Sequence, residues 1–431
     1  MLAKAEREQI ISLINREVVP AIGCTEPIAV ALCVAKATET LGKKPQKIEV
    51  LLSANILKNA MGVGIPGTGM IGLPIAVALG SLIGKSEYEL EVLKDCTPEA
   101  VEEGKALIAS KVIEIGLKMG IEEKLYIEVK CTSGAISATA IIAGGHTNFV
   151  YVERNGDVML DNKLKTASVQ GVDDIQLNMR KVYEFATTTP VDELRFILET
   201  RRLNKHAAER SFKGNYGHML GKTLSSVKNE DLMMGDTTYT HILSYTSAAC
   251  DARMAGAMIP VMSNSGSGNQ GITATLPVVI YAEDNHCSEE AMIRALTLSH
   301  LTVIYIKQSL GRLSALCGCV VAATGSSCGI TYLMGGDYTQ VTFAVKNMIA
   351  NITGIICDGA KPSCALKLAS GVSTAVLSAV LARDNNCVTS VEGIIDDDVD
   401  QCIRNLTKIG SQGMNETDRM VLDIMTHKQC H

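Results

Sequence analysis

The 431-residue sequence has no tryptophan, and aromatic residues make up only 4% of it. Proteins that bind single-stranded nucleic acid stack bases on aromatic side chains, and few are present here. Acidic residues outnumber basic ones (46 against 40), and Lys and Arg form no dense run. Because neutralising a phosphate backbone needs clustered basic residues, we expect no nucleic-acid partner.

Long hydrophobic runs are also missing. The most apolar stretch, residues 70–84, is shorter than the ~20 residues that a membrane-spanning helix needs. The N-terminus, MLAKAEREQIISLINREVVP, is charged and amphipathic, unlike a secretory signal peptide. We therefore expect a cytoplasmic protein with no membrane partner.

Cysteine and small residues, by contrast, are abundant, with 14 cysteines and 37 glycines. In a reducing compartment we do not expect disulfides. Some cysteines must be small core residues, such as Cys33 in the apolar stretch IAVALCVAKA. A role in metal binding or catalysis has to be argued for each of the others.

The hydrophobic patterns divide the chain into two parts. Helices are predicted at 5–19, after Pro27 and at 98–119, and strands at 47–54, 124–133, 137–145 and 147–160. Asn155–Gly156 is a strong hairpin signal within the last strand segment. From residue 188 onward helical patterns dominate, with an interruption near GSQG (410–413). We predict an α+β fold with a mixed helix and strand domain (1–187) followed by a mainly helical domain (188–431).

Two loop motifs suit an anionic ligand. GCTEP (23–27) precedes a predicted helix, with Thr25 as its expected cap and Pro27 in its first turn. A cysteine at such a position lies where the helix dipole favours a thiolate. NSGSGNQG (264–271) is dense in glycine and serine, so several backbone N–H groups can converge on a carboxylate or phosphate.

Two further motifs carry cysteines. LCGC (316–319) contains Cys317 and Cys319, and ICDGAKPSC (356–364) places Cys357 and Cys364 around a turn. The second spacing is too wide for a typical zinc knuckle and differs from the common ferredoxin runs. A loop of this length can still present two thiolates to one corner of an iron–sulfur cluster, with a third thiolate arriving from elsewhere. Such a cluster would keep one iron open as a Lewis acid.

GCTEP, SGSGNQG and ICDGAKPSCALKLASG occur in this order and together resemble the L-cysteine desulfidase family, a relative of the iron–sulfur L-serine dehydratases. The resemblance extends from about residue 10 to about residue 410. It implies a [4Fe–4S] lyase that converts L-cysteine to pyruvate, ammonia and hydrogen sulfide. The cysteine pair is somewhat narrower here than in the serine dehydratases.

The resemblance also implies roles for individual residues. Cluster ligands would be Cys317, Cys357 and Cys364. Cys24 would act as a displaceable fourth ligand or in proton transfer, and Thr25 and Glu26 would line the same pocket. The substrate carboxylate would be held by Ser265, Ser267 and Asn269. Cys430, near the C-terminus, is another candidate for the open cluster site. We expect a small amino-acid substrate and a homodimer.

Several alternatives stay open at this point. The general base is either Cys24 as a thiolate or Lys58 with a pKa lowered by burial. L-Serine could replace L-cysteine as the substrate of the same machinery. A pyridoxal-phosphate lyase would use Lys58 for the Schiff base and the glycine–serine loop for the phosphate. A zinc-binding or redox-sensing protein without enzymatic activity is the remaining alternative.

Overall fold

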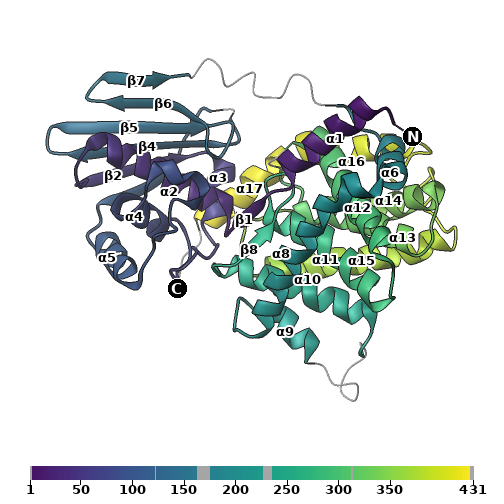
Figure 1. Cartoon of the computed structure of the whole chain (residues 1–431). Coiled ribbons are helices and arrows are strands. Elements are labelled where there is room, and N and C mark those ends of the chain that lie inside the picture. Colours follow the sequence, from purple (N-terminus) through teal and green to yellow (C-terminus); the bar gives the residue numbers. More distant parts are fainter. Residues whose placement is uncertain (1, 122, 163–174, 227–234, 312–313, 428–431) are drawn as a thin grey trace.

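The structure, a computed structural model, describes residues 2–121, 123–162, 175–226, 235–311 and 314–427. Figure 1 shows two regions side by side: a β-sheet with helices packed on it, and a larger assembly of helices. The mixed sheet comes first in the chain and the largely helical part follows. The predicted α+β fold class is therefore confirmed.

The sheet region contains six strands in the order β3-β2-β4-β5-β6-β7. They are β2 (Lys47–Leu52), β3 (Ile113–Leu117), β4 (Tyr126–Ser133), β5 (Ile136–Ala143), β6 (Phe149–Arg154) and β7 (Asp157–Asp161). In β2, Ile48, Val50 and Leu52 alternate with less buried residues. The apolar face of the sheet packs with α2 (Thr25–Leu41) and α4 (Leu73–Leu82) into one core.

The sheet tests two of the predictions. The single helix expected over 98–119 is wrong, because α5 covers only Pro98–Ala109 and β3 follows it. The alternation around Ile113 suits a strand, and β3 pairs in parallel with β2 after the crossover through α5. The hairpin is confirmed: Arg154 pairs with Asp157, and Asn155 and Gly156 both have positive φ (51° and 89°).

The helical region fills most of the second half. Its helices are α6 (Met179–Thr188), α7 (Val191–Leu194), α8 (Leu198–Phe212), α9 (Leu220–Ser225), α10 (Thr238–Met254), α11 (Gly268–Asp284), α12 (Glu289–Leu310), α13 (Gly318–Leu333), α14 (Tyr338–Ile352), α15 (Cys364–Arg383), α16 (Val399–Lys408) and α17 (Asn415–Thr426). A short π-helical turn (Ile409–Gly413) separates α16 from α17, as the predicted interruption near GSQG required.

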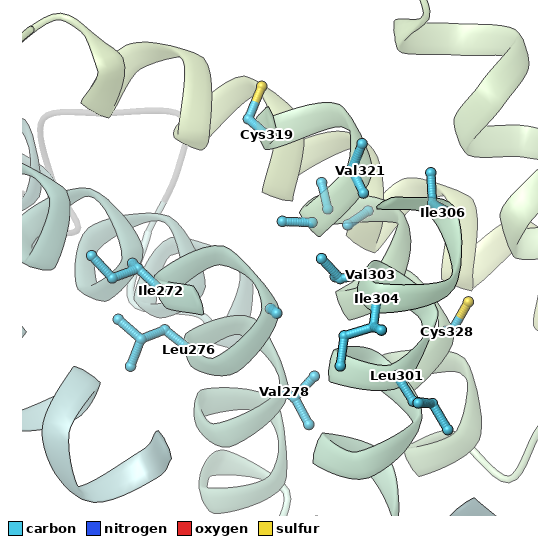
Figure 2. Close-up of a cluster of buried hydrophobic side chains, with 14 of the residues drawn as sticks. Ile272, Leu276, Val278, Leu301, Val303, Ile304, Ile306, Cys319, Val321 and Cys328 are labelled. Carbon is cyan, nitrogen blue, oxygen red and sulfur yellow. The ribbon is translucent and has the colours of Figure 1, made fainter. Parts of the chain in front are cut away.

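The centre of the helical region is the apolar cluster between α11, α12 and α13. Figure 2 shows Ile304 of α12 and Cys328 of α13 within it. Cys328 is fully buried, so it serves as a small core residue. Cys319 lies at the other end of the same cluster, near the start of α13.

Both ends of the chain cross between the two regions. α1 (Lys4–Glu17) packs in the helical core through Ile10 and Ile14, and β1 (Pro20–Ile22) pairs antiparallel with β8 (Pro260–Met262). α17 packs on α3 (Ala54–Ala60) of the sheet region. The β1–β8 pairing matters for function, because GCTEP directly follows β1 and the glycine–serine loop directly follows β8.

One helix of the described residues, α15, is long and apolar enough to span a membrane by length and composition. It packs against α10, α13 and α14, and 44% of its most apolar window is buried in the protein. Core helices of globular proteins have the same properties, so we interpret α15 as part of the helical core.

Candidate active site

GCTEP forms the start of α2. Cys24 is the N-cap residue, with extended backbone angles (φ −92°, ψ 133°). The prediction of Thr25 as the cap is therefore wrong, because the N-cap residue is one position earlier. The Thr25 hydroxyl instead lies 3.1 Å from Glu26 Oε2 and 3.5 Å from the Gly266 carbonyl oxygen. Cys24 Sγ donates to the same Glu26 oxygen (2.9 Å), so the motif surrounds one carboxylate with a thiol and a hydroxyl.

The charge states of Glu26 and Cys24 follow from their burial and from the groups beside them. Burial raises the pKa of Glu26, but the positive charge of His146 and the hydrogen bond from Cys24 outweigh it and hold the pKa below its usual value. Burial and the adjacent Glu26 raise the pKa of Cys24 well above the usual thiol value. The protein therefore holds Cys24 as a thiol, which does not favour the thiolate base considered from the sequence.

The glycine–serine loop is a tight turn before α11. Ser265 and Gly266 both have positive φ (48° and 81°). Ser267 is the N-cap of α11, and its hydroxyl accepts from the Gln270 N–H (3.4 Å). The Ser265 hydroxyl donates to Asn264 Oδ1 (2.8 Å). Both serine side chains thus have partners inside the loop, while the first turn of α11 leaves backbone N–H groups without carbonyl partners.

A buried histidine holds this loop in place through hydrogen bonds. His300 of α12 is fully buried, and burial lowers its pKa to about 3, so it is neutral. Its Nδ1 lies 3.0 Å from Asn264 Nδ2, and its Nε2 lies 3.0 Å from Thr275 Oγ1. Because the Asn264 amide can only donate through its nitrogen, Nδ1 is the acceptor and Nε2 carries the proton. This arrangement fixes the Asn264 side chain, and through it the Ser265 hydroxyl.

Two chain segments meet to bring the cluster cysteines together. Leu316 and Ile356 form an isolated antiparallel bridge. The Cys317 N–H donates to the Ile355 carbonyl (2.9 Å), and the Cys357 N–H donates to the Ala315 carbonyl (2.7 Å). The turn after Cys357 then leads to Cys364, the first residue of α15. Backbone pairing therefore holds the segment of Cys317 beside that of Cys357, and the turn carries the chain on to Cys364.

Four helices begin around these residues. Cys24 caps α2, Ser267 caps α11, Cys317 caps α13 and Cys364 opens α15. A helix N-terminus carries about half a positive charge, so this arrangement favours anions such as thiolates or carboxylates. Lys361 and Lys367 lie on the loop and first turn around Cys364, where both form ion pairs with Asp358.

The thiols respond unequally to this environment. A hydrogen bond from Cys319 lowers the pKa of Cys317 to about 7, and Lys367 contributes in the same direction. Burial raises the pKa of Cys357 to about 11 and also raises that of Cys364. Without a metal, only Cys317 is therefore close to ionisation at neutral pH. Metal binding would have to displace the protons of the other two.

The motifs meet in a cavity of about 120 Å³ between the two regions. Eight of the residues predicted from the sequence line it: Cys24, Glu26, Ser265, Ser267, Asn269, Cys317, Cys357 and Cys364. Thr25 and Lys58 are not among the lining residues. Cys430, the other candidate for the open cluster site, lies outside the described residues.

Lys58 is buried rather than solvated, with 1% of its surface exposed. Its ammonium group pairs with Asp418 of α17 and donates to the Cys357 carbonyl (3.3 Å). It thus links α3, α17 and the cysteine loop behind the cavity. This position does not support a Schiff-base lysine or a base that acts inside the cavity.

Sequence reasoning missed several lining residues, above all Asn59, His146, Arg253, Gln270 and Lys307. Gln270 belongs to the glycine–serine motif and could have been included. His146 lies in the turn between β5 and β6, within GGHTN, and no local pattern separates it from an ordinary hairpin residue. A lone histidine near glycines was the only signal available.

The donor set of Cys317, Cys357 and Cys364 is compatible with an iron–sulfur cluster. Among the described residues, no three His, Cys, Asp or Glu side chains lie close enough together to bind one metal ion. In a cube of four irons each thiolate binds a different iron, so the thiolates stand farther apart than around zinc. Three thiols that line one cavity, with helix N-termini and lysines nearby, could each bind a different iron of such a cluster.

Comparison with known proteins identifies the class. A family model described as the serine dehydratase alpha chain matches residues 87–423. The chain therefore belongs to the serine dehydratase alpha chain family. Membership relates it to the iron–sulfur L-serine dehydratases, as the motifs predicted, and indicates an amino-acid dehydratase or lyase.

Close relatives give the narrower placement. The chain is 78% identical over 430 residues to a UPF0597 protein of Phocaeicola vulgatus, with 100% of both chains covered. It is 74% identical over 428 residues to a UPF0597 protein of Bacteroides thetaiotaomicron, covering 99% of each. A UPF0597 protein of Oleidesulfovibrio alaskensis is 47% identical over 429 residues, covering 99% of this chain and 100% of the relative.

Proposed function

We propose that this protein is a [4Fe–4S]-dependent lyase that cleaves L-cysteine to pyruvate, ammonia and hydrogen sulfide. The observation that carries the proposal is that Cys317, Cys357 and Cys364 line the same cavity as GCTEP and the glycine–serine loop. Family membership supports the coarser reaction class. The choice of L-cysteine over L-serine follows from the resemblance of the three motifs to the desulfidases.

Cys317, Cys357 and Cys364 would hold the cluster. When bound, it would supply a Lewis-acidic iron for the sulfur of the substrate. Lys367, which also lines the cavity, adds positive charge beside the thiolates.

The chain's own residues supply the proton chemistry. His146 lines the cavity, and its charge lowers the pKa of Glu26, so the imidazole and the carboxylate are close. Imidazole is the most common general base, so we assign His146, in its neutral form, to take the Cα proton, and the adjacent Glu26 carboxylate stabilises the imidazolium that forms. The C–H electron pair then forms the C=C bond as the C–S bond breaks. The aminoacrylate formed tautomerises to an imine, which water hydrolyses to pyruvate and ammonia.

The test is a comparison of substrates under strict anaerobiosis. We expect sulfide and pyruvate in equal amounts from L-cysteine, with a kcat/KM at least tenfold above that for pyruvate formation from L-serine. A preference for L-serine would keep the reaction class and overturn the substrate. A pyridoxal-phosphate enzyme would instead absorb near ~410–430 nm as purified, because its cofactor is bound as a Schiff base.

The non-enzymatic alternative predicts metal binding without turnover of either amino acid. The cytoplasmic location and the homodimer remain predictions from the sequence.

A further inference from the structure

Two buried charges of opposite sign line the cavity without pairing. Arg253 of α10 is 4% exposed and Glu26 is 8% exposed. Among the described residues, neither side chain forms an ion pair. A buried guanidinium and a buried carboxylate are each costly without a partner of opposite charge. The cavity between them therefore suits a ligand that carries both charges.

The surroundings of Arg253 point to an anion. Its Nη1 donates to Asn269 Oδ1 (3.0 Å), while its Nε is buried with no hydrogen-bond partner among the described residues. Gly268, the first residue of α11, lets the guanidinium lie against the helix N-terminus. A Cβ there would be 2.3 Å from Arg253 Nε. A fixed cation and a helix N-terminus at one place both favour a carboxylate.

The contacts of Asn269 suit a role other than the predicted binding of the substrate carboxylate. Its Oδ1 accepts from Arg253, and its Nδ2 lies 3.4 Å from Met254 Sδ. Both ends of the amide therefore have partners in the protein. Asn269 is placed to orient the guanidinium rather than to contact the substrate carboxylate.

The surroundings of Glu26 point to a cation. Oε2 accepts from Cys24 and Thr25, and Oε1 accepts from Asn59 Nδ2 (3.3 Å). These donors are neutral. With His146 in the neutral form that a general base requires, they fix the carboxylate without neutralising its charge. Oε1 retains a lone pair for one more donor.

We propose that Arg253 binds the α-carboxylate of the substrate and that Glu26 binds its α-ammonium group, so that the cavity selects free, zwitterionic α-amino acids. This inference rests on the proposed lyase function and adds the residues that bind the two charged groups of the substrate. Asn269 is a positioning residue for Arg253.

A second explanation for Arg253 is that it balances the charge of the cluster. The position of Arg253 favours binding of the substrate instead. Lys361 and Lys367 lower the pKa of Cys317. The charge of Arg253 lowers the pKa of Cys24 and Glu26, on the GCTEP side of the cavity.

The experiment uses two thiols that differ in one charged group. 3-Mercaptopropionate has the carboxylate without the ammonium group, and cysteamine has the ammonium group without the carboxylate. Binding of each is measured by calorimetry on the anaerobic, iron-loaded protein. The variants are Arg253→Gln, Arg253→Lys and Glu26→Gln, and Arg210→Gln on the exposed end of α8 is the matched control.

We expect Arg253→Gln to weaken 3-mercaptopropionate roughly 10- to 100-fold, the range of a charge-assisted hydrogen bond, and to change cysteamine less than twofold. Glu26→Gln should show the reverse pattern. Arg253→Lys should weaken the binding of 3-mercaptopropionate several-fold. Lys keeps the positive charge but lacks the planar pair of N–H donors with which Arg binds a carboxylate. If Arg253→Gln does not fold, the same contrast in Arg253→Lys decides the matter.

Equal weakening of both thiols by Arg253→Gln, or a loss of iron in that variant, would overturn the inference in favour of cluster charge balance. Sulfide release from L-cysteine by the unaltered protein is measured in parallel. If it is absent while the crossed binding pattern holds, the desulfidase proposal fails and the recognition of both charged groups stands.

Discussion

The two regions contribute different chemistry to one cavity. The helical region supplies the three cysteines, the glycine–serine loop and Arg253, which are groups that bind sulfur, iron or anions. The sheet region supplies Glu26 and His146, which are groups that bind cations or move protons. Neither region encloses the cavity alone, so activity depends on how they are held together. Because the two regions supply different groups, we expect that substitutions can remove metal binding and proton transfer independently.

Removing the imidazole from the sheet region should have the largest effect. We expect His146→Asn to lower kcat by ~10²–10⁴-fold, the usual contribution of a general base. Iron and sulfide content should remain at the level of the unaltered protein, since no cluster ligand changes. His206→Asn, on the exposed face of α8, is the control and should change neither. If the activity of His146→Asn stays within threefold of the original, the assignment of the base fails.

The contact between the cysteine loop and α3 gives the next largest effect. Gly359 has φ +90°, and a Cβ there would lie 2.2 Å from the Lys58 carbonyl oxygen. Gly359→Ala should destabilise the protein by about 3 kcal/mol and reduce its iron content, because the loop must move off α3. Thermal unfolding and iron analysis measure both effects.

Gly354→Ala is the matched control for that substitution. It lies just before the same loop, and a Cβ there meets no atom within 4 Å. Equal melting temperatures for the two variants would show that the stability of the protein does not depend on the contact between this loop and α3.

Some of this arrangement could be predicted from the sequence and some could not. The four motifs were visible because each is a local signal of a turn or a helix start. Arg253 lies in TSAACDARMAG, where it looks like an ordinary basic residue in the last turn of a helix. It reaches the cavity only because α10 ends beside α11 and because β1 pairs with β8. Such pairings between distant segments leave no local signal.

The ion pair between Lys58 and Asp418 should have a moderate effect. Lys58→Met leaves Asp418 without its partner and should cost about 2 kcal/mol. That is less than for a fully buried pair, because Asp418 is partly exposed. A double-mutant cycle with Asp418→Asn should show coupling of about 1 kcal/mol in denaturant unfolding. If Lys58→Met instead loses activity more than 100-fold with unchanged stability, Lys58 acts in catalysis.

The smallest effect concerns the outer surface of the helical region. His241 contacts Asp284 (2.7 Å) and Asp236 (2.6 Å). Burial lowers its pKa, but these hydrogen bonds outweigh burial and raise the pKa above the usual value. The stabilisation is therefore complete below about pH 6.5, the ordinary pKa of histidine, and is lost as the pH rises through the folded-state value.

Denaturant unfolding of His241→Gln measures this contribution. The variant should be less stable than the original protein by under ~1 kcal/mol at acidic pH, since the site is partly exposed. The difference should vanish at alkaline pH. A constant difference across the pH range would show that the contacts stabilise through packing rather than charge.

The central claim is that Cys317, Cys357 and Cys364 together hold an iron–sulfur cluster. The direct measurement is iron and acid-labile sulfide in anaerobically purified protein, beside Cys357→Ala and the control Cys287→Ala, whose thiol lies outside the cavity. We predict about four of each per chain in the original protein and in the control, as for a [4Fe–4S] cluster, and almost none in Cys357→Ala. An original protein without iron, or a Cys357→Ala variant as fully loaded as the control, would contradict the account.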